Sequence, residues 1–115
     1  LIILNVQEDF MDKEEMEMLR VSVTSLKEKF RNIAIEAKNE ISDILDVLHV
    51  DDVDVDILLR EGVPSSEIIK LSKEKQVDMI VMGTNGRNSF QDIILGSTSQ
   101  NVIRLSKCPV LVVPN

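Results

Sequence analysis

Apolar residues along the first half of the chain follow two patterns, one typical of a strand and one typical of a helix. Residues 1–6 (LIILNV) form a nearly continuous apolar run, as expected for a strand that is covered on both faces. Between residues 14 and 48, apolar side chains recur every three or four positions, which places them on one stripe of a helix. Because such a helix would be longer than a small domain is wide, we expect the part before about residue 21 to be irregular or to form a separate turn.

The middle of the chain predicts a second strand and a second helix. Residues 53–59 alternate between apolar and mainly acidic positions, which indicates a strand with one wetter face. A helix of about three turns is predicted after Gly62. Pro64 suits its first position, and Glu67 suits the positive end of the helix dipole.

The last third of the chain predicts two further strands with a helix between them. Residues 78–83 (DMIVMG) and 109–114 (PVLVVP) are typical of buried strands, and residues 97–105 are typical of a helix. Strands and helices therefore alternate along the whole sequence. This order predicts an α/β fold with a parallel sheet and right-handed crossovers.

Composition narrows the class of protein. With 115 residues, 43% of them hydrophobic, residues 1–115 are expected to form a single domain. Lys and Arg total 13 against 20 Asp and Glu, so the net charge of −7 argues against nucleic acid as a partner. The single cysteine, Cys108, cannot form an internal disulfide, and every apolar run is shorter than the roughly 20 residues of a membrane helix. We therefore expect a cytoplasmic protein that does not enter a membrane.

Three of the four glycines lie between the strand predicted at 78–83 and the helix predicted at 97–105. Ligands of open α/β sheets bind at the carboxyl ends of the strands, and glycine lets a ligand approach the backbone. Ser97 to Gln100 match a capping box, S-x-x-Q, so the amides of a helix N-terminus are expected to face the loop. The arrangement favours an anion, above all phosphate. Any one of these glycines alone could serve only a turn or close packing.

The glycine-rich stretch matches no common nucleotide fingerprint, but it does match the pattern G-2x-G-9x-G-[ST]. With VDMIVMGTNGR before it, ILGSTSQNVIR within it and CPVLVVP after it, the chain resembles the universal stress protein family. The resemblance implies a Rossmann-like, adenine nucleotide alpha hydrolase-like fold, an open parallel sheet with helices on both faces. It also implies ATP as ligand, with or without Mg²⁺. Ribose and phosphate contacts are then assigned to Gly83, Gly86, Gly96, Ser97 and Thr98, and adenine contacts to Val6 and Met82.

Arg87 is the one cation in the glycine loop, and it either reaches a phosphate or lies in solvent. The resemblance implies two further features. In the family the last strand commonly pairs with its symmetry mate, so a homodimer through residues 110–113 is expected. Family members also begin with a strand and helix that this sequence does not show. Such a strand is expected upstream, between the strands at 1–6 and 78–83, unless those two pair directly or a strand of another chain enters.

Three functions remain open. The first is a nucleotide sensor of the stress response, and the second is a weak ATPase or an enzyme that phosphorylates itself on Ser89 or Ser97. The loop offers only Asp92 as a carboxylate for Mg²⁺, which favours the sensor. The third is a family member that binds no nucleotide.

Two other features have simpler interpretations than a metal site. Asp52, Asp54 and Asp56 imitate the start of a calcium loop without its later glycine and glutamate, so an acidic outer strand face is expected instead. His49, the only histidine, is expected to interact with the carbonyls that end a helix.

Overall fold

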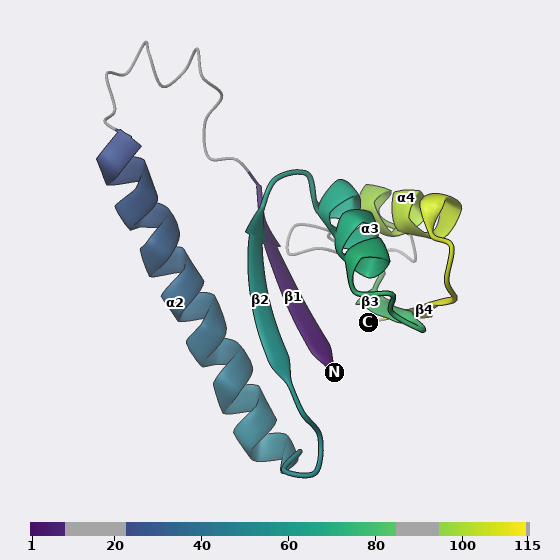
Figure 1. Ribbon diagram of the computed structural model, residues 1–115, viewed down its shortest axis with the longest axis horizontal. Coiled ribbons are helices and arrows are strands. Elements are labelled where there is room, and N and C mark those ends of the chain that lie inside the picture. Colours follow the sequence, from purple (N-terminus) through teal and green to yellow (C-terminus); the bar gives the residue numbers. More distant parts are fainter. Residues whose placement is uncertain (9–22, 85–94, 115) are drawn as a thin grey trace. The chain divides into compact units, whose positions relative to one another are not determined.

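The computed structural model describes residues 1–8, 23–84 and 95–114 (Figure 1). The chain divides into two compact units, Leu1–Glu61 and Gly62–Asn115. Each unit contains one pair of parallel strands. The predicted α/β class with parallel strands is therefore confirmed within each unit.

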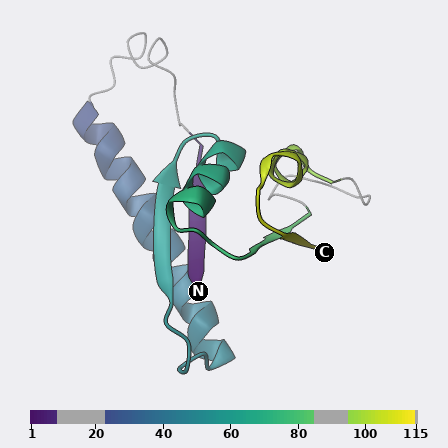
Figure 2. The ribbon, with the colours of Figure 1, turned by 45° about the vertical axis from the view of Figure 1, so that its right-hand side comes forward.

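The first unit is a strand, a long helix and a parallel strand. β1 (Ile2–Gln7) pairs with β2 (Asp56–Glu61) along its full length, from Ile2 opposite Asp56 to Gln7 opposite Glu61. The helix α2 (Val23–Leu48) runs alongside the strand pair in both views (Figures 1 and 2). With 26 residues it is about 39 Å long. The stripe predicted for residues 14–48 is helical from Val23 onward, and residues 9–22 lie outside the described part of the chain.

The C-terminus of α2 follows a common pattern. His49 has a positive φ of 50°, and its backbone N–H donates to the carbonyl oxygen of Asp46 at 3.4 Å. The expected contact between His49 and the end of the helix is thus made by its backbone, while the side chain is exposed. A left-handed residue at this position lets the chain turn toward β2.

The second strand begins later than its alternating pattern predicts. β2 starts at Asp56, whose N–H donates to the carbonyl oxygen of Leu1 at 2.9 Å. The amino group of Leu1 donates in turn to the carbonyl oxygen of Asp54 at 2.8 Å. Asp52 and Asp54 therefore precede the strand. The prediction that all three aspartates form an outer strand face is wrong for these two.

The second unit contains two helices and two strands. α3 (Pro64–Glu74) begins with Pro64 in its first turn and Glu67 close behind, as predicted. β3 (Ile80–Gly83) pairs with β4 (Val110–Val113), from Ile80 opposite Val110 to Gly83 opposite Val113. α4 (Ser97–Leu105) has the predicted bounds. β3 begins two residues later than predicted, and β4 is one residue shorter at each end, where Pro109 and Pro114 flank it and cannot donate to a ladder.

The core of the second unit lies where α3 and α4 pack together. Val102 of α4 is fully buried, and Ile69 and Leu71 of α3 are nearly so. Two serines of this unit are also buried, Ser65 on α3 and Ser99 on α4. In the described residues of the first unit, the buried apolar side chain is Ala37.

The strands form two separate two-stranded sheets, β1–β2 and β3–β4. Within the described residues, β1 and β3 are not joined by a ladder, and the strand expected between them stays a prediction. None of the helices described here is long and apolar enough to cross a membrane. The cytoplasmic location predicted above is likewise still a prediction.

Candidate functional site

The predicted site residues lie on two elements of the second unit. Met82 and Gly83 are the last residues of β3, and Gly96 directly precedes α4. Ser97 and Thr98 are the first two residues of that helix. The described structure thus places one group at the carboxyl end of a strand and the other at the N-terminus of a helix.

Three further residues stand apart from this arrangement. Gly86 and Arg87 lie outside the described residues. Val6 lies in β1, opposite Arg60, and therefore belongs to the first unit. Its predicted adenine contact stays a prediction.

The two ends of the glycine-rich loop are hydrogen-bonded to each other. The backbone N–H of Gly96 donates to the carbonyl oxygen of Thr84 at 2.9 Å. The N–H of Thr84 donates to the carbonyl oxygen of Val113 at 3.2 Å, which ties the same residue to β4. We call Gly83, Thr84, Gly96 and Ser99, together with these bonds, the loop base. It fixes where the loop leaves β3 and where it enters α4.

Ser99 closes the loop base from the helix side. Its hydroxyl donates to the carbonyl oxygen of Gly83 at 3.0 Å and lies 3.4 Å from that of Thr84. The residue is only 3% exposed. Sequence reasoning assigned Ser97 and Thr98 but gave Ser99 no role of its own. The available signal was a third consecutive hydroxyl at a helix N-terminus, in a position where the helix turns it away from Ser97.

The capping box predicted for Ser97 and Gln100 is not formed. Gly96 is the N-cap residue, with extended φ and ψ of −62° and 157°, and it has no side chain to cap the helix. The side-chain amide of Gln100 instead donates to the carbonyl oxygen of Leu95 at 3.2 Å. The prediction placed the cap one residue too late, because S-x-x-Q fits a helix starting either at or after its serine.

Gly96 is required by packing at the loop base. A Cβ atom on this residue would lie 3.1 Å from the carbonyl oxygen of Thr84, so one of the two segments would have to shift. Its φ of −62° is open to any residue. The close approach of two backbone segments therefore explains this glycine without a ligand.

The N-terminus of α4 has the electrostatics of an anion site. The first three amides of a helix have no carbonyl one turn back to accept from them, and the helix dipole makes this end positive. The first turn of α4 carries no acidic residue, and Ser97 is exposed. Although the chain has a net charge of −7, this end of α4 offers hydrogen-bond donors, and its first turn carries no carboxylate that would repel an anion.

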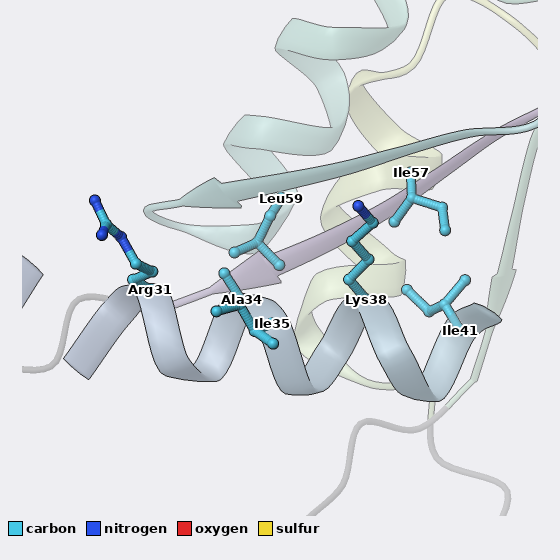
Figure 3. Close-up of a pocket in the computed structure, with 7 residues that line it drawn as sticks. All are labelled: Arg31, Ala34, Ile35, Lys38, Ile41, Ile57 and Leu59. Atoms are coloured by element: carbon cyan, nitrogen blue, oxygen red, sulfur yellow. The ribbon is translucent and has the colours of Figure 1, made fainter. Parts of the chain in front are cut away.

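A groove between α2 and β2 has a different chemistry from the loop base (Figure 3). This groove has a volume of about 190 Å³. Its walls are the apolar side chains of Ala34, Ile35, Ile41, Ile57 and Leu59, and Arg31 and Lys38 also line it. None of these lining residues belongs to the predicted nucleotide site. The groove offers apolar surface rather than the array of amides that phosphate requires.

Comparison with known proteins connects this geometry to a family. Universal stress protein MJ0577 of Methanocaldococcus jannaschii is 36% identical over 96 residues, which are 83% of the chain and 59% of that protein. Universal stress protein YxiE of Bacillus subtilis is 41% identical over 61 residues, 53% of the chain and 41% of that protein. The chain thus spans about three fifths or less of the length of these relatives.

Solved structures share the fold. The structure of hypothetical protein MJ0577 matches with a TM-score of 0.77 and 33% identity, over 99% of the chain and 74% of that structure. Universal stress protein UspA from Lactobacillus plantarum matches with a TM-score of 0.77 and 23% identity, over 97% of the chain and 75% of that structure. These matches confirm the predicted Rossmann-like class. The family model of the universal stress proteins matches residues 1–114, and the chain belongs to that family.

Proposed function

We propose that the chain binds an adenine nucleotide, ATP, at the loop between β3 and α4 and acts as a nucleotide sensor in the stress response. The observation that carries the proposal is the loop base. It holds the carboxyl end of β3 and the positive end of α4 on either side of a loop that begins with Gly83 and ends with Gly96. Because the loop base fixes the start of α4, the amides of its first turn are already oriented for an anion.

The proposed contacts follow from position. The amides and hydroxyls of Ser97 and Thr98 would hold phosphate oxygens, and Gly83 would let the ribose come against the backbone. Met82 and Val6 would line the adenine, and Gly86 and Arg87 would complete the loop around the phosphates. Mg²⁺ would accompany the nucleotide and reduce its repulsion from an acidic protein.

The scarcity of carboxylates in the loop sequence favours a sensor over an enzyme. Phosphoryl transfer requires groups that hold Mg²⁺ and orient the nucleophile, and residues 83–98 contain a single acidic residue, Asp92. Hydrolysis of ATP, or phosphorylation of Ser89 or Ser97, is the competing proposal. Slow or absent phosphate release from bound ATP would separate the sensor from the ATPase, and mass spectrometry after incubation with ATP would detect a phosphoserine.

Isothermal titration with ATP and Mg²⁺ tests nucleotide binding directly. Saturable heat above dilution is expected, together with a higher melting temperature, because a ligand that binds only the folded state stabilises it. No heat and an unchanged melting temperature would show that the chain belongs to the third class, a family member without nucleotide.

The variant Gly83→Val tests the position of the site. Its branched side chain would fill the space in which the ligand meets the backbone at the end of β3, so ATP binding is expected to be lost. Val81→Ile is the matched control, because it also adds bulk to an exposed position of β3 but lies two residues before the loop. ATP binding by Gly83→Val that equals that of the wild type would place the nucleotide elsewhere.

A further inference from the structure

We infer that Ser99 is a positioning residue of the nucleotide loop, whose hydroxyl holds the carbonyl oxygens of Gly83 and Thr84 toward α4 and so keeps them from facing a bound phosphate. The inference rests on the proposed function, since it concerns how the same site tolerates an anion. It assigns a role to a serine outside the glycine and hydroxyl pattern of the loop.

The geometry leaves Ser99 no proton for a ligand. A serine hydroxyl has one hydrogen to donate, and that of Ser99 points to the carbonyl oxygen of Gly83 at 3.0 Å, with that of Thr84 at 3.4 Å. The residue is 3% exposed, so it is buried in the second unit. Its hydroxyl therefore acts within the protein.

The helix separates Ser99 from the hydroxyl expected to meet the ligand. Successive residues of an α-helix turn by about 100°, so residues two apart point in nearly opposite directions. Ser97 is exposed and Ser99 is buried, as this rotation requires. One of these serines can thus face a ligand while the other holds the protein backbone.

The carbonyl oxygens that Ser99 engages lie where their direction matters. Gly83 and Thr84 begin the loop that would surround the phosphates, and a carbonyl oxygen turned toward a phosphate would repel it. The N–H of Gly96 also donates to the carbonyl oxygen of Thr84, at 2.9 Å. Ser99 is the side chain that adds Gly83 to this arrangement. Both carbonyls are held by the buried Ser99, on the side of α4 opposite the exposed Ser97, and the amides at the start of the helix are left for the anion.

Ser99→Ala removes the hydroxyl and leaves the residue otherwise small and buried. Its affinity for ATP is expected to fall about 3- to 10-fold, the range for one hydrogen bond. Affinity for adenosine, which has no phosphate, is expected to stay unchanged. Isothermal titration of both ligands supplies the comparison, because a general loss of structure would weaken both.

Two further variants complete the test. Ser72→Ala is the matched control: the hydroxyl of Ser72 donates to the carbonyl oxygen of Ile69 at 2.8 Å within α3, so its loss should leave both affinities unchanged. Ser99→Thr keeps the hydroxyl and is expected to retain ATP affinity within about threefold of the wild type. It also covers the case in which the alanine variant does not fold.

The outcomes separate the inference from the function beneath it. ATP affinity that is unchanged in Ser99→Ala, or an equal loss for ATP and adenosine, would overturn the positioning role while leaving nucleotide binding intact. Failure of Ser99→Thr to bind ATP while it still binds adenosine would show that the hydroxyl does not suffice and would also overturn it. A wild-type chain that binds neither ligand would overturn both proposals.

Discussion

Two glycines of the second unit are needed for different physical reasons. Gly62, which precedes α3, has a φ of +140°, a backbone conformation that residues with a Cβ rarely adopt. Gly96 has an ordinary φ but no room for a Cβ beside Thr84. Gly62 is needed because of its backbone conformation, and Gly96 is needed because two backbone segments approach closely at the loop base.

Replacing Gly62 by alanine should therefore lower stability without changing the nucleotide site. The strained φ is expected to reduce the free energy of unfolding by about 1 to 3 kcal/mol. The new Cβ would also lie 3.3 Å from Cγ of Glu67, although that flexible side chain can move. Chemical denaturation would measure the change, with Ser66→Ala on the exposed side of α3 as control. Equal stability of Gly62→Ala and the wild type would contradict the strain argument.

Single residues show where sequence reasoning succeeds and where it stops. The glycines, Ser97 and Thr98 could be predicted as site residues because their spacing forms a recognisable pattern, and their contact with a ligand stays a prediction. The hydrogen bonds of Ser99 could not be predicted from local sequence, because they depend on which carbonyl oxygens lie opposite α4, and those oxygens are 15 and 16 residues away. The N-cap was misplaced by one residue for a related reason, since Gly96 is fixed by its bond to Thr84.

Among the elements, α4 illustrates how one buried side chain anchors a short helix. A helix of nine residues is marginal by itself, so its stability comes from packing. Val102 is 0% exposed and lies on the buried face of α4, whereas its neighbour Ile103 is 45% exposed.

Val102→Ala should accordingly destabilise the protein by about 2 kcal/mol, through lost burial and a cavity that the helices cannot fully close. Ile103→Ala is the matched control on the same helix, and its cost should be below about 1 kcal/mol because water already reaches the side chain. Both variants gain helix propensity, so the difference between them reports burial. Similar denaturation midpoints for the two variants would show that α4 is not held by its Val102 face.

The boundaries of the elements were predictable wherever local signals set them. α3 begins at its proline, and α4 spans the predicted residues. β2 was predicted too early because valine and aspartate alternate before it as they would in a strand. Its first residue, Asp56, pairs with the segment at β1, where its N–H donates to the carbonyl oxygen of Leu1. That information belongs to pairing between segments more than 50 residues apart, and no local pattern contains it.

For the molecule as a whole, the alternation of strands and helices was enough to predict the fold class that the solved structures confirm. It was not enough to relate the two units. Val6 and the loop base belong to different units, and the adenine contact of Val6 depends on how these are joined. Local periodicity determines which face of an element is apolar, but it does not determine which distant element covers that face.

The last strand, β4, bears on whether two copies of the molecule associate. β4 pairs with β3 along one edge, and within the described residues no strand pairs with its other edge. All four of its residues are apolar, and Leu111 is 50% exposed. An apolar edge strand of this kind is a template for another strand, and a twofold axis through it would let two copies satisfy each other. We therefore propose a homodimer through residues 110–113.

Leu111→Lys tests this assembly by charge. In a twofold contact the residues next to the axis lie near their own counterparts, and Leu111 is an inner residue of β4. Two lysines there would be brought close together, so the dimer should dissociate. Sedimentation equilibrium over a range of concentrations should then give the mass of two chains for the wild type and of one chain for the variant. Val47→Lys is the control, because it places the same charge on an apolar side chain of α2 that is 76% exposed, and its mass should equal that of the wild type. A wild-type mass of one chain at every concentration would exclude the dimer, and a dimeric Leu111→Lys would move the interface away from β4.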